Sequence, residues 1–155
     1  MKFNRTTLIV VSLLALAAML LSACGPAATP TAAPAASGGT LAITGLVDKP
    51  LNLSETDLRA MSPATITADQ PKVGSASFTG VRISDLMTAA SVQSGAATLA
   101  LTGSDGYSAQ IDMATLKACA DCMVAFTDTP GTFLAVMPGQ AGKVWVKNLI
   151  KLEFK

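Results

Sequence analysis

The first 39 residues limit most strongly what this chain can fold into, because they supply no material for a folded core. Lys2 and Arg5 precede Leu8–Leu21, an apolar run broken only by Ser12. A helix of that length rises about 21 Å, short of the roughly 30 Å hydrocarbon core, so residues 1–23 are predicted to be a signal peptide of an exported protein. Gly25–Gly39 has no charge and no large apolar side chain. This stretch is therefore predicted to be a tether, and the folded domain is residues 40–155.

The residues at the end of the apolar run resemble the bacterial lipoprotein processing box. They read Leu-Ser-Ala-Cys, ending at Cys24. The resemblance implies diacylglyceryl attachment to the Cys24 sulfur, cleavage before Cys24 and acylation of the new N-terminus. Two or more acyl chains would anchor the protein stably to a membrane, either on the outer face of the cell membrane or on an outer membrane. The alternative is an ordinary signal peptide that is cleaved nearby.

Composition excludes several classes of function. The 155 residues carry a formal charge of +1 with both signs interspersed, which provides no electrostatic footprint for a nucleic-acid partner. The chain has no histidine, so Ser-His-Asp and Cys-His nucleophile pairs and imidazole metal sites are ruled out. The mean hydropathy of +0.49 arises largely in the leader and the tether, and it says little about the domain.

The domain is predicted to consist mainly of short strands. Strand-like residues occupy 41–47, 64–67, 76–79, 97–102, 107–111, 123–126 and 133–137. The loop Gly103–Gly106, with its Asp-Gly pair between two of these runs, predicts a hairpin. Apolar residues of one parity in 144–154 predict a long half-buried strand, or two strands broken near Asn148.

Three short helices are predicted among the strands. Ser54 and Asp57 form a capping box for a helix that Pro63 stops, and Ser84 is predicted to cap a second helix over 84–90. Residues 113–118 are the third candidate. Short helices among many strands favour a single α+β domain, mixed but mainly β, over a doubly wound sheet.

An ordered set of motifs along the domain resembles the oxidoreductase molybdopterin-binding domain of sulfite oxidase-like proteins. The motifs are Gly45–Pro50, Leu53-Ser54, Phe78-Thr-Gly-Val81 before Ile83–Leu86, Asp105–Ser108 with Ile111, Val136–Pro138, and Trp145–Lys147 before Ile150 and Leu152. The resemblance implies a mixed, mainly β fold with small helices at its edges. It also implies molybdopterin as the cofactor.

The departures from that family concern the cofactor. Catalytic members ligate molybdenum through a cysteine, but the matching stretch, Ala64–Val73, contains none. The family's arginine falls at Leu134, and its longer loop shrinks to Asp128–Thr132. The cofactor's phosphate would have only Arg59 and Arg82 to grip it. We therefore expect no molybdopterin, and a non-catalytic module that binds an unidentified protein or small molecule; a molybdopterin-dependent oxidoreductase with divergent cofactor binding is the alternative.

Cys119 and Cys122 form the one local constellation with possible chemistry, and three interpretations remain open. A structural disulfide is the default for an exported protein. A thiol-disulfide redox site is the second, although the pair follows a short helix instead of preceding one. Metal binding is the third, but two thiolates do not close a tetrahedral site, and no metal is predicted.

Tyr107 is the most plausible polar wall of any retained cofactor cavity. Asp105 lies beside it in the hairpin loop, and Asp69 lies in the stretch where the metal cysteine is missing. These three residues are the candidate pocket. The alternative is that Tyr107 is an ordinary hairpin residue whose ring packs while its hydroxyl meets water.

Overall fold

The computed structural model describes residues 39–155, which belong to one compact unit, Ala35–Lys155. The predicted signal peptide, Cys24 and all of the tether except Gly39 lie outside the described residues. Within residues 39–155, no helix combines the length and the apolar character needed to cross a bilayer.

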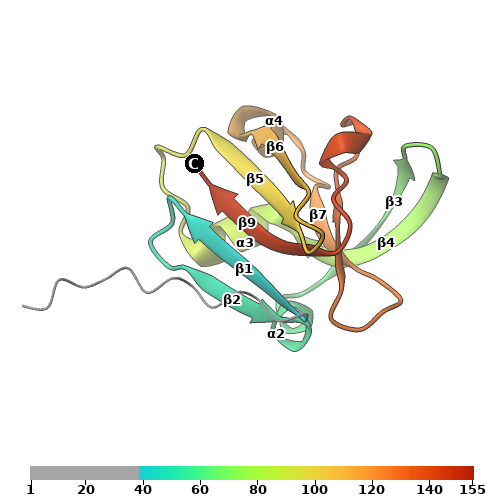
Figure 1. The fold of residues 1–155 in the computed structure, drawn as a ribbon, viewed down its shortest axis with the longest axis horizontal. Coiled ribbons are helices and arrows are strands. Elements are labelled where there is room, and N and C mark those ends of the chain that lie inside the picture. The colour runs from blue at the N-terminus through green and yellow to red at the C-terminus, as the bar shows by residue number, and fades with distance from the viewer. Residues whose placement is uncertain (1–38) are drawn as a thin grey trace, which may run out of the picture. The chain divides into compact units, whose positions relative to one another are not determined.

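Two sheets form the framework (Figure 1). The five-stranded sheet has the order β2 (Leu51–Ser54), β1 (Thr40–Gly45), β9 (Leu149–Phe154), β5 (Thr98–Gly103) and β6 (Ser108–Asp112). Its neighbours run antiparallel, except that β1 and β9 run parallel. The four-stranded antiparallel sheet has the order β3 (Ala64–Gln70), β4 (Gly74–Arg82), β7 (Met123–Phe126) and β8 (Phe133–Val136).

The helices are short, as predicted. They are α2 (Glu55–Ala60), α3 (Ile83–Ala90), α4 (Met113–Ala118) and the 3₁₀ turn η1 (Gly142–Val144). Side chains from both sheets and from the helices form one apolar cluster, in which Leu58, Leu86, Phe133 and Phe154 are almost fully buried. Burying a side chain of this size stabilises the fold by about 1.5–3 kcal/mol. The domain is therefore a single mixed, mainly β unit, and the predicted α+β class is confirmed.

The predicted hairpin is confirmed, and two other predicted strands pair in a second hairpin that was not predicted. β5 and β6 pair across the Asp-Gly loop. Residues 64–67 and 76–79 belong to β3 and β4, whose pairing extends to Gln70 and Gly74. In Figure 1 this β3–β4 hairpin extends beyond the five-stranded sheet.

The predicted break near Asn148 is confirmed, but the residues before the break do not form the predicted strand. Asn148 has a left-handed φ of 48°, which ends the extended backbone there, and β9 begins only at Leu149. The segment before it contains η1, and Val144, Trp145 and Val146 are all buried, so the alternation does not continue through it. The strand β2 was not predicted. It runs directly into the capping box and pairs with β1 at the edge of the sheet.

One predicted helix cap is correct and the other is wrong. The Ser54 hydroxyl accepts a hydrogen bond from the Asp57 N–H, and the Asp57 carboxylate accepts one from the Ser54 N–H. The second helix, α3, begins one residue before Ser84, so Ser84 lies inside it. Its first N–H, on Ile83, donates to the carbonyl of Cys122 at 2.9 Å. A backbone partner from another segment thus takes the place of a side-chain cap.

Gly80 is required where β4 pairs closely with β7. A Cβ atom at this position would lie 2.1 Å from the Val124 carbonyl oxygen and 2.5 Å from the Ala125 Cα. No side chain fits at that distance. The glycine of the Phe78–Val81 motif therefore serves the pairing of two strands.

Candidate functional site

A groove of about 420 Å³ lies among three chain segments that are remote in sequence. We name it the strand groove. Its lining residues come from the β3–β4 turn, from β8 and the β7–β8 loop, and from the chain just before β9. They are Gln70, Val73, Thr127, Thr129, Thr132, Leu134, Lys147 and Asn148.

The strand groove unites the three places at which the sequence departs from the resembled family. Gln70 and Val73 belong to the stretch that lacks the metal cysteine. Thr129 and Thr132 belong to the loop that the resemblance predicts to be shortened, and Leu134 lies where the resemblance places the family's arginine. Residues singled out separately along the sequence therefore line one concave surface, which makes this groove the candidate site.

The polar groups of the groove are mostly neutral. The Thr127 and Thr132 hydroxyls bond each other, and the Thr132 hydroxyl donates to the Thr129 carbonyl at 2.7 Å. The amides of Gln70 and Asn148 and the ammonium of Lys147 are the remaining polar groups of the lining. The threonines thus hold the loop in shape, while the amides and the ammonium provide donors toward a ligand.

The β7–β8 loop is held from the other side by α2. The Gly131 N–H donates to Glu55 Oε2 at 2.6 Å, and Arg59 forms an ion pair with Glu55 Oε1 at 2.6 Å. The hydrogen bond from the Gly131 N–H is the main cause that holds the pKa of Glu55 below its ordinary value. The Arg59 guanidinium lowers this pKa further. The Arg59 guanidinium carbon also lies 4.1 Å from the centre of the Phe126 ring.

The donor set of the strand groove does not fit a molybdenum cofactor. The resemblance implies a thiolate ligand for molybdenum, but neither of the two cysteines in residues 39–155 lines this groove, and their sulfur atoms lie 2.07 Å apart. A phosphate group calls for arginine, but Arg59 is engaged by Glu55, and Arg82 pairs with Asp121 at 3.5 Å. Across residues 39–155, no three His, Cys, Asp or Glu side chains gather closely enough to hold a metal ion.

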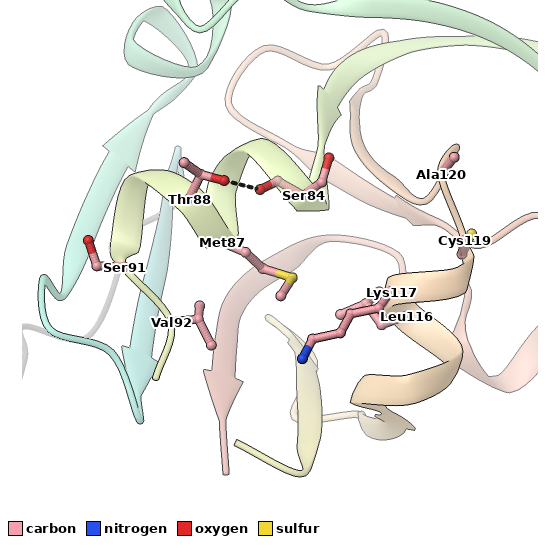
Figure 2. A pocket seen from close by; sticks show the side chains of 9 residues that line it. All are labelled: Ser84, Met87, Thr88, Ser91, Val92, Leu116, Lys117, Cys119 and Ala120. Carbon is pink, nitrogen blue, oxygen red and sulfur yellow. Dashed lines mark hydrogen bonds between the residues drawn. The ribbon is translucent and has the colours of Figure 1, made fainter. Parts of the chain in front are cut away.

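A second groove, of about 390 Å³, lies between α3 and α4 (Figure 2). We name it the helix groove. Its lining is formed by α3 and the two residues after it, and by the end of α4 and the two residues that follow. The lining residues are Ser84, Met87, Thr88, Ser91, Val92, Leu116, Lys117, Cys119 and Ala120. This groove is not predictable from the sequence, because no local pattern marks the facing surfaces of two separate helices.

Cys119 and Cys122 lie at bonding distance, with their sulfur atoms 2.07 Å apart. Cys122 is buried, whereas Cys119 is half-buried and is the C-cap residue of α4. The negative end of a helix dipole disfavours a thiolate, and so does a neighbouring carboxylate such as Asp121. This position is therefore unfavourable for a reactive thiol, although the oxidation state of the pair in the cell stays a prediction.

The structure brings together two of the three predicted pocket residues. The Tyr107 N–H donates to Asp105 Oδ1 at 3.0 Å, and the Tyr107 hydroxyl donates to the Lys143 carbonyl at 2.9 Å. Asp69 is exposed on β3, in the other sheet. None of the three lines the strand groove or the helix groove. The Tyr107 hydroxyl, a candidate polar wall of a retained cavity, is hydrogen-bonded to a backbone carbonyl instead.

Comparisons with known proteins define the family. The model of the oxidoreductase molybdopterin binding domain matches residues 28–155, and the chain therefore belongs to that family. Among solved structures, the sulfane dehydrogenase SoxCD from Paracoccus pantotrophus has a similar fold, with a TM-score of 0.64 and 23% sequence identity. The similarity covers 75% of this chain and 38% of that one, so the chain spans well under half the length of that protein. No curated protein matches the sequence closely enough to be counted as a relative.

Proposed function

We propose that this member of the molybdopterin-binding family is a non-catalytic binding module, exported and anchored to a membrane through lipid on Cys24. The observation that carries the proposal is the lining of the strand groove. It is open, and its side chains are hydroxyls, amides, one ammonium and two apolar groups, with no thiolate, imidazole or guanidinium. Such a surface suits a small polar molecule or a protein segment.

Metal and pterin analysis tests this proposal. The full chain would be purified from its native compartment, beside a family member that retains the metal cysteine and is prepared in the same host. We expect no stoichiometric molybdenum or pterin in this protein and a full complement in the control. One molybdenum and one pterin per chain would overturn the proposal.

Lipid attachment is tested separately. We expect incorporation of a labelled fatty acid into the wild-type chain, and its loss together with release from the membrane in Cys24→Ser. The motif at residues 21–24 supports this expectation. An unlabelled wild-type chain in the soluble fraction would contradict it, and would leave the strand-groove proposal standing.

A molybdopterin-dependent oxidoreductase with divergent cofactor binding is the second candidate. Membership of the family over residues 28–155 favours it. The metal and pterin analysis distinguishes the two candidates, because only this one requires a bound cofactor. A thiol-disulfide function is the third reading, and a reduction potential of the Cys119–Cys122 pair below about −300 mV would identify a structural bond instead.

A further inference from the structure

The helix groove has the composition of a small-molecule site, with an apolar base and a few polar groups around it. Leu116 is buried at its base, and Met87 and Val92 are half-buried beside it. In Figure 2, Met87 of α3 and Lys117 of α4 both extend into the space between the two helices. The volume of about 390 Å³ lies in the range of ligand sites in proteins.

Lys117 is the one charged residue in the lining of this groove. Among the ion pairs of residues 39–155, none involves Lys117. The nearby carboxylate of Asp121 is paired with Arg82, and Asp85 does not line the groove. The ammonium of Lys117 lies among apolar side chains, and the lining contains no carboxylate. Such a groove is complementary to an anion that carries an apolar group.

The hydroxyl groups of α3 in the lining already have partners. The Ser84 hydroxyl donates to Asp85 Oδ1 at 3.5 Å. The Thr88 hydroxyl is already used, because it donates to the Ser84 carbonyl at 2.9 Å. Ser91 follows α3 with a left-handed φ of 52° and also lines the groove, but in Figure 2 its hydroxyl points away from the space between the two helices. Lys117 therefore supplies the principal polar contact for a ligand in this groove.

The two walls of the groove are joined by the loop that holds the cysteine pair. Cys119 follows α4 and is bonded to Cys122. The carbonyl of Cys122 accepts the hydrogen bond of the Ile83 N–H at the start of α3, and Asp121 pairs with Arg82 just before it. A groove with tied walls needs little reorganisation when a ligand enters, which favours affinity.

We propose that the helix groove binds a small amphipathic monoanion, a carboxylate or sulfonate with a short hydrocarbon or aryl body. The anionic group contacts Lys117, and the apolar body lies against Met87, Val92 and Leu116. The proposal depends neither on the lipid anchor nor on the strand groove, so a failure here leaves the proposed function untouched.

The test compares octanoate with the neutral octanamide, up to about 10 mM, on the full chain in detergent, below the critical micelle concentration of octanoate. Amide shifts in NMR spectra report the site. We expect octanoate to shift residues 84–92 and 116–120 and to bind about tenfold more tightly than octanamide. Lys117→Gln should lose that preference and Lys117→Arg should keep it, while Lys147→Gln, in the strand groove, should bind like the wild type.

Three outcomes would overturn the proposal. They are no binding of octanoate over this range, equal binding of octanoate and octanamide, and an octanoate affinity unaffected by Lys117→Gln. Lys117 is exposed and outside the core, so its substitution should leave the fold intact. The amide spectrum of each variant checks this directly.

Discussion

The carboxylate of Glu55, the first residue of α2, accepts a hydrogen bond from the N–H of Gly131, 76 residues further along the chain. This contact ties α2 to the loop between β7 and β8, three of whose threonines line the strand groove. Gly131 has a φ of 74°, which glycine adopts without strain. The shape of the groove therefore depends on a helix that does not line it.

Removing this contact should loosen the loop. In Glu55→Gln the charge is lost and the hydrogen bond weakens, so the Gly131 amide should exchange with solvent about ten times faster. Hydrogen exchange measured by NMR checks this. Asp57→Asn is the matched control, since it alters a carboxylate of the same helix that contacts only Ser54. Equal acceleration at Gly131 in both variants would contradict the role of Glu55.

Acid should destabilise the domain, whereas a change of pH around neutrality should leave its stability unchanged. The hydrogen bonds of Ser54 hold the pKa of Asp57 below its ordinary value, as Gly131 and Arg59 do for the pKa of Glu55. Carboxylates with a lowered pKa stabilise the folded state above their unfolded values, and that stability is lost as the pH falls through their folded values.

Glu153 adds to the same trend. Burial alone would raise its pKa, but the ammonium groups of Lys151 and Lys155 outweigh burial and hold the pKa below its ordinary value. With no histidine in the chain, the unfolding temperature should be constant from about pH 5.5 to 8 and fall below about pH 4.5. Glu55→Gln/Asp57→Asn should fall less steeply in acid. A transition near pH 6.5 would contradict this account.

The two helix starts should respond differently to loss of a serine. Ser54→Ala removes a capping hydroxyl and should cost about 1 kcal/mol of unfolding free energy. Ser84→Ala should cost less than about 0.5 kcal/mol, because a backbone carbonyl already accepts from the first N–H of α3. Urea titrations measure both. Equal costs would show that the observed start of α3 is wrong.

Gly80→Ala should be among the most damaging single-methyl changes in the domain. The added Cβ would meet the backbone of β7, and the strands must separate, at a cost of about 2–3 kcal/mol or more. Gly95→Ala is the control, since a Cβ there has no neighbour within 4 Å. Its unfolding free energy should stay within about 0.5 kcal/mol of the wild type. A well-tolerated Gly80→Ala would contradict the close approach of β4 and β7 at this position.

Cys119 and Cys122 should resist alkylation in protein prepared without reductant, and react after reduction. Because the bond closes a loop of only four residues, Cys119→Ser/Cys122→Ser should cost about 1–2 kcal/mol by the loop-length relation. Mass spectrometry after alkylation and a urea titration measure the two quantities. Ready alkylation of the unreduced protein would show that the pair is not a disulfide.

Features set by residues close in sequence were predictable. The capping box joins Ser54 and Asp57, which are three positions apart, and the β5–β6 hairpin follows from its Asp-Gly loop. The hydrogen bonds of the cap and the chain reversal of the hairpin each involve only a few consecutive residues. Their patterns can therefore be recognised in the sequence without knowledge of the tertiary structure. The family motifs were visible for a different reason, as an ordered set spread along the domain.

The tertiary structure decided what depends on remote partners. α3 begins at Ile83 because the carbonyl of Cys122 lies there, and β2 exists because β1 offers it a partner. Asp69, predicted to share a pocket with Tyr107, lies in the other sheet. No local pattern encodes these pairings.

The sequence by itself determined the absence of histidine and of any cysteine in Ala64–Val73, and it predicts a folded part of about 115 residues. Only the tertiary structure decided that the positions at which this chain departs from the family meet in one groove. The strand order brings the β3–β4 turn and the β7–β8 loop together from distant parts of the chain. The tertiary structure likewise placed Lys117 opposite Met87, on helices whose relative position depends on packing.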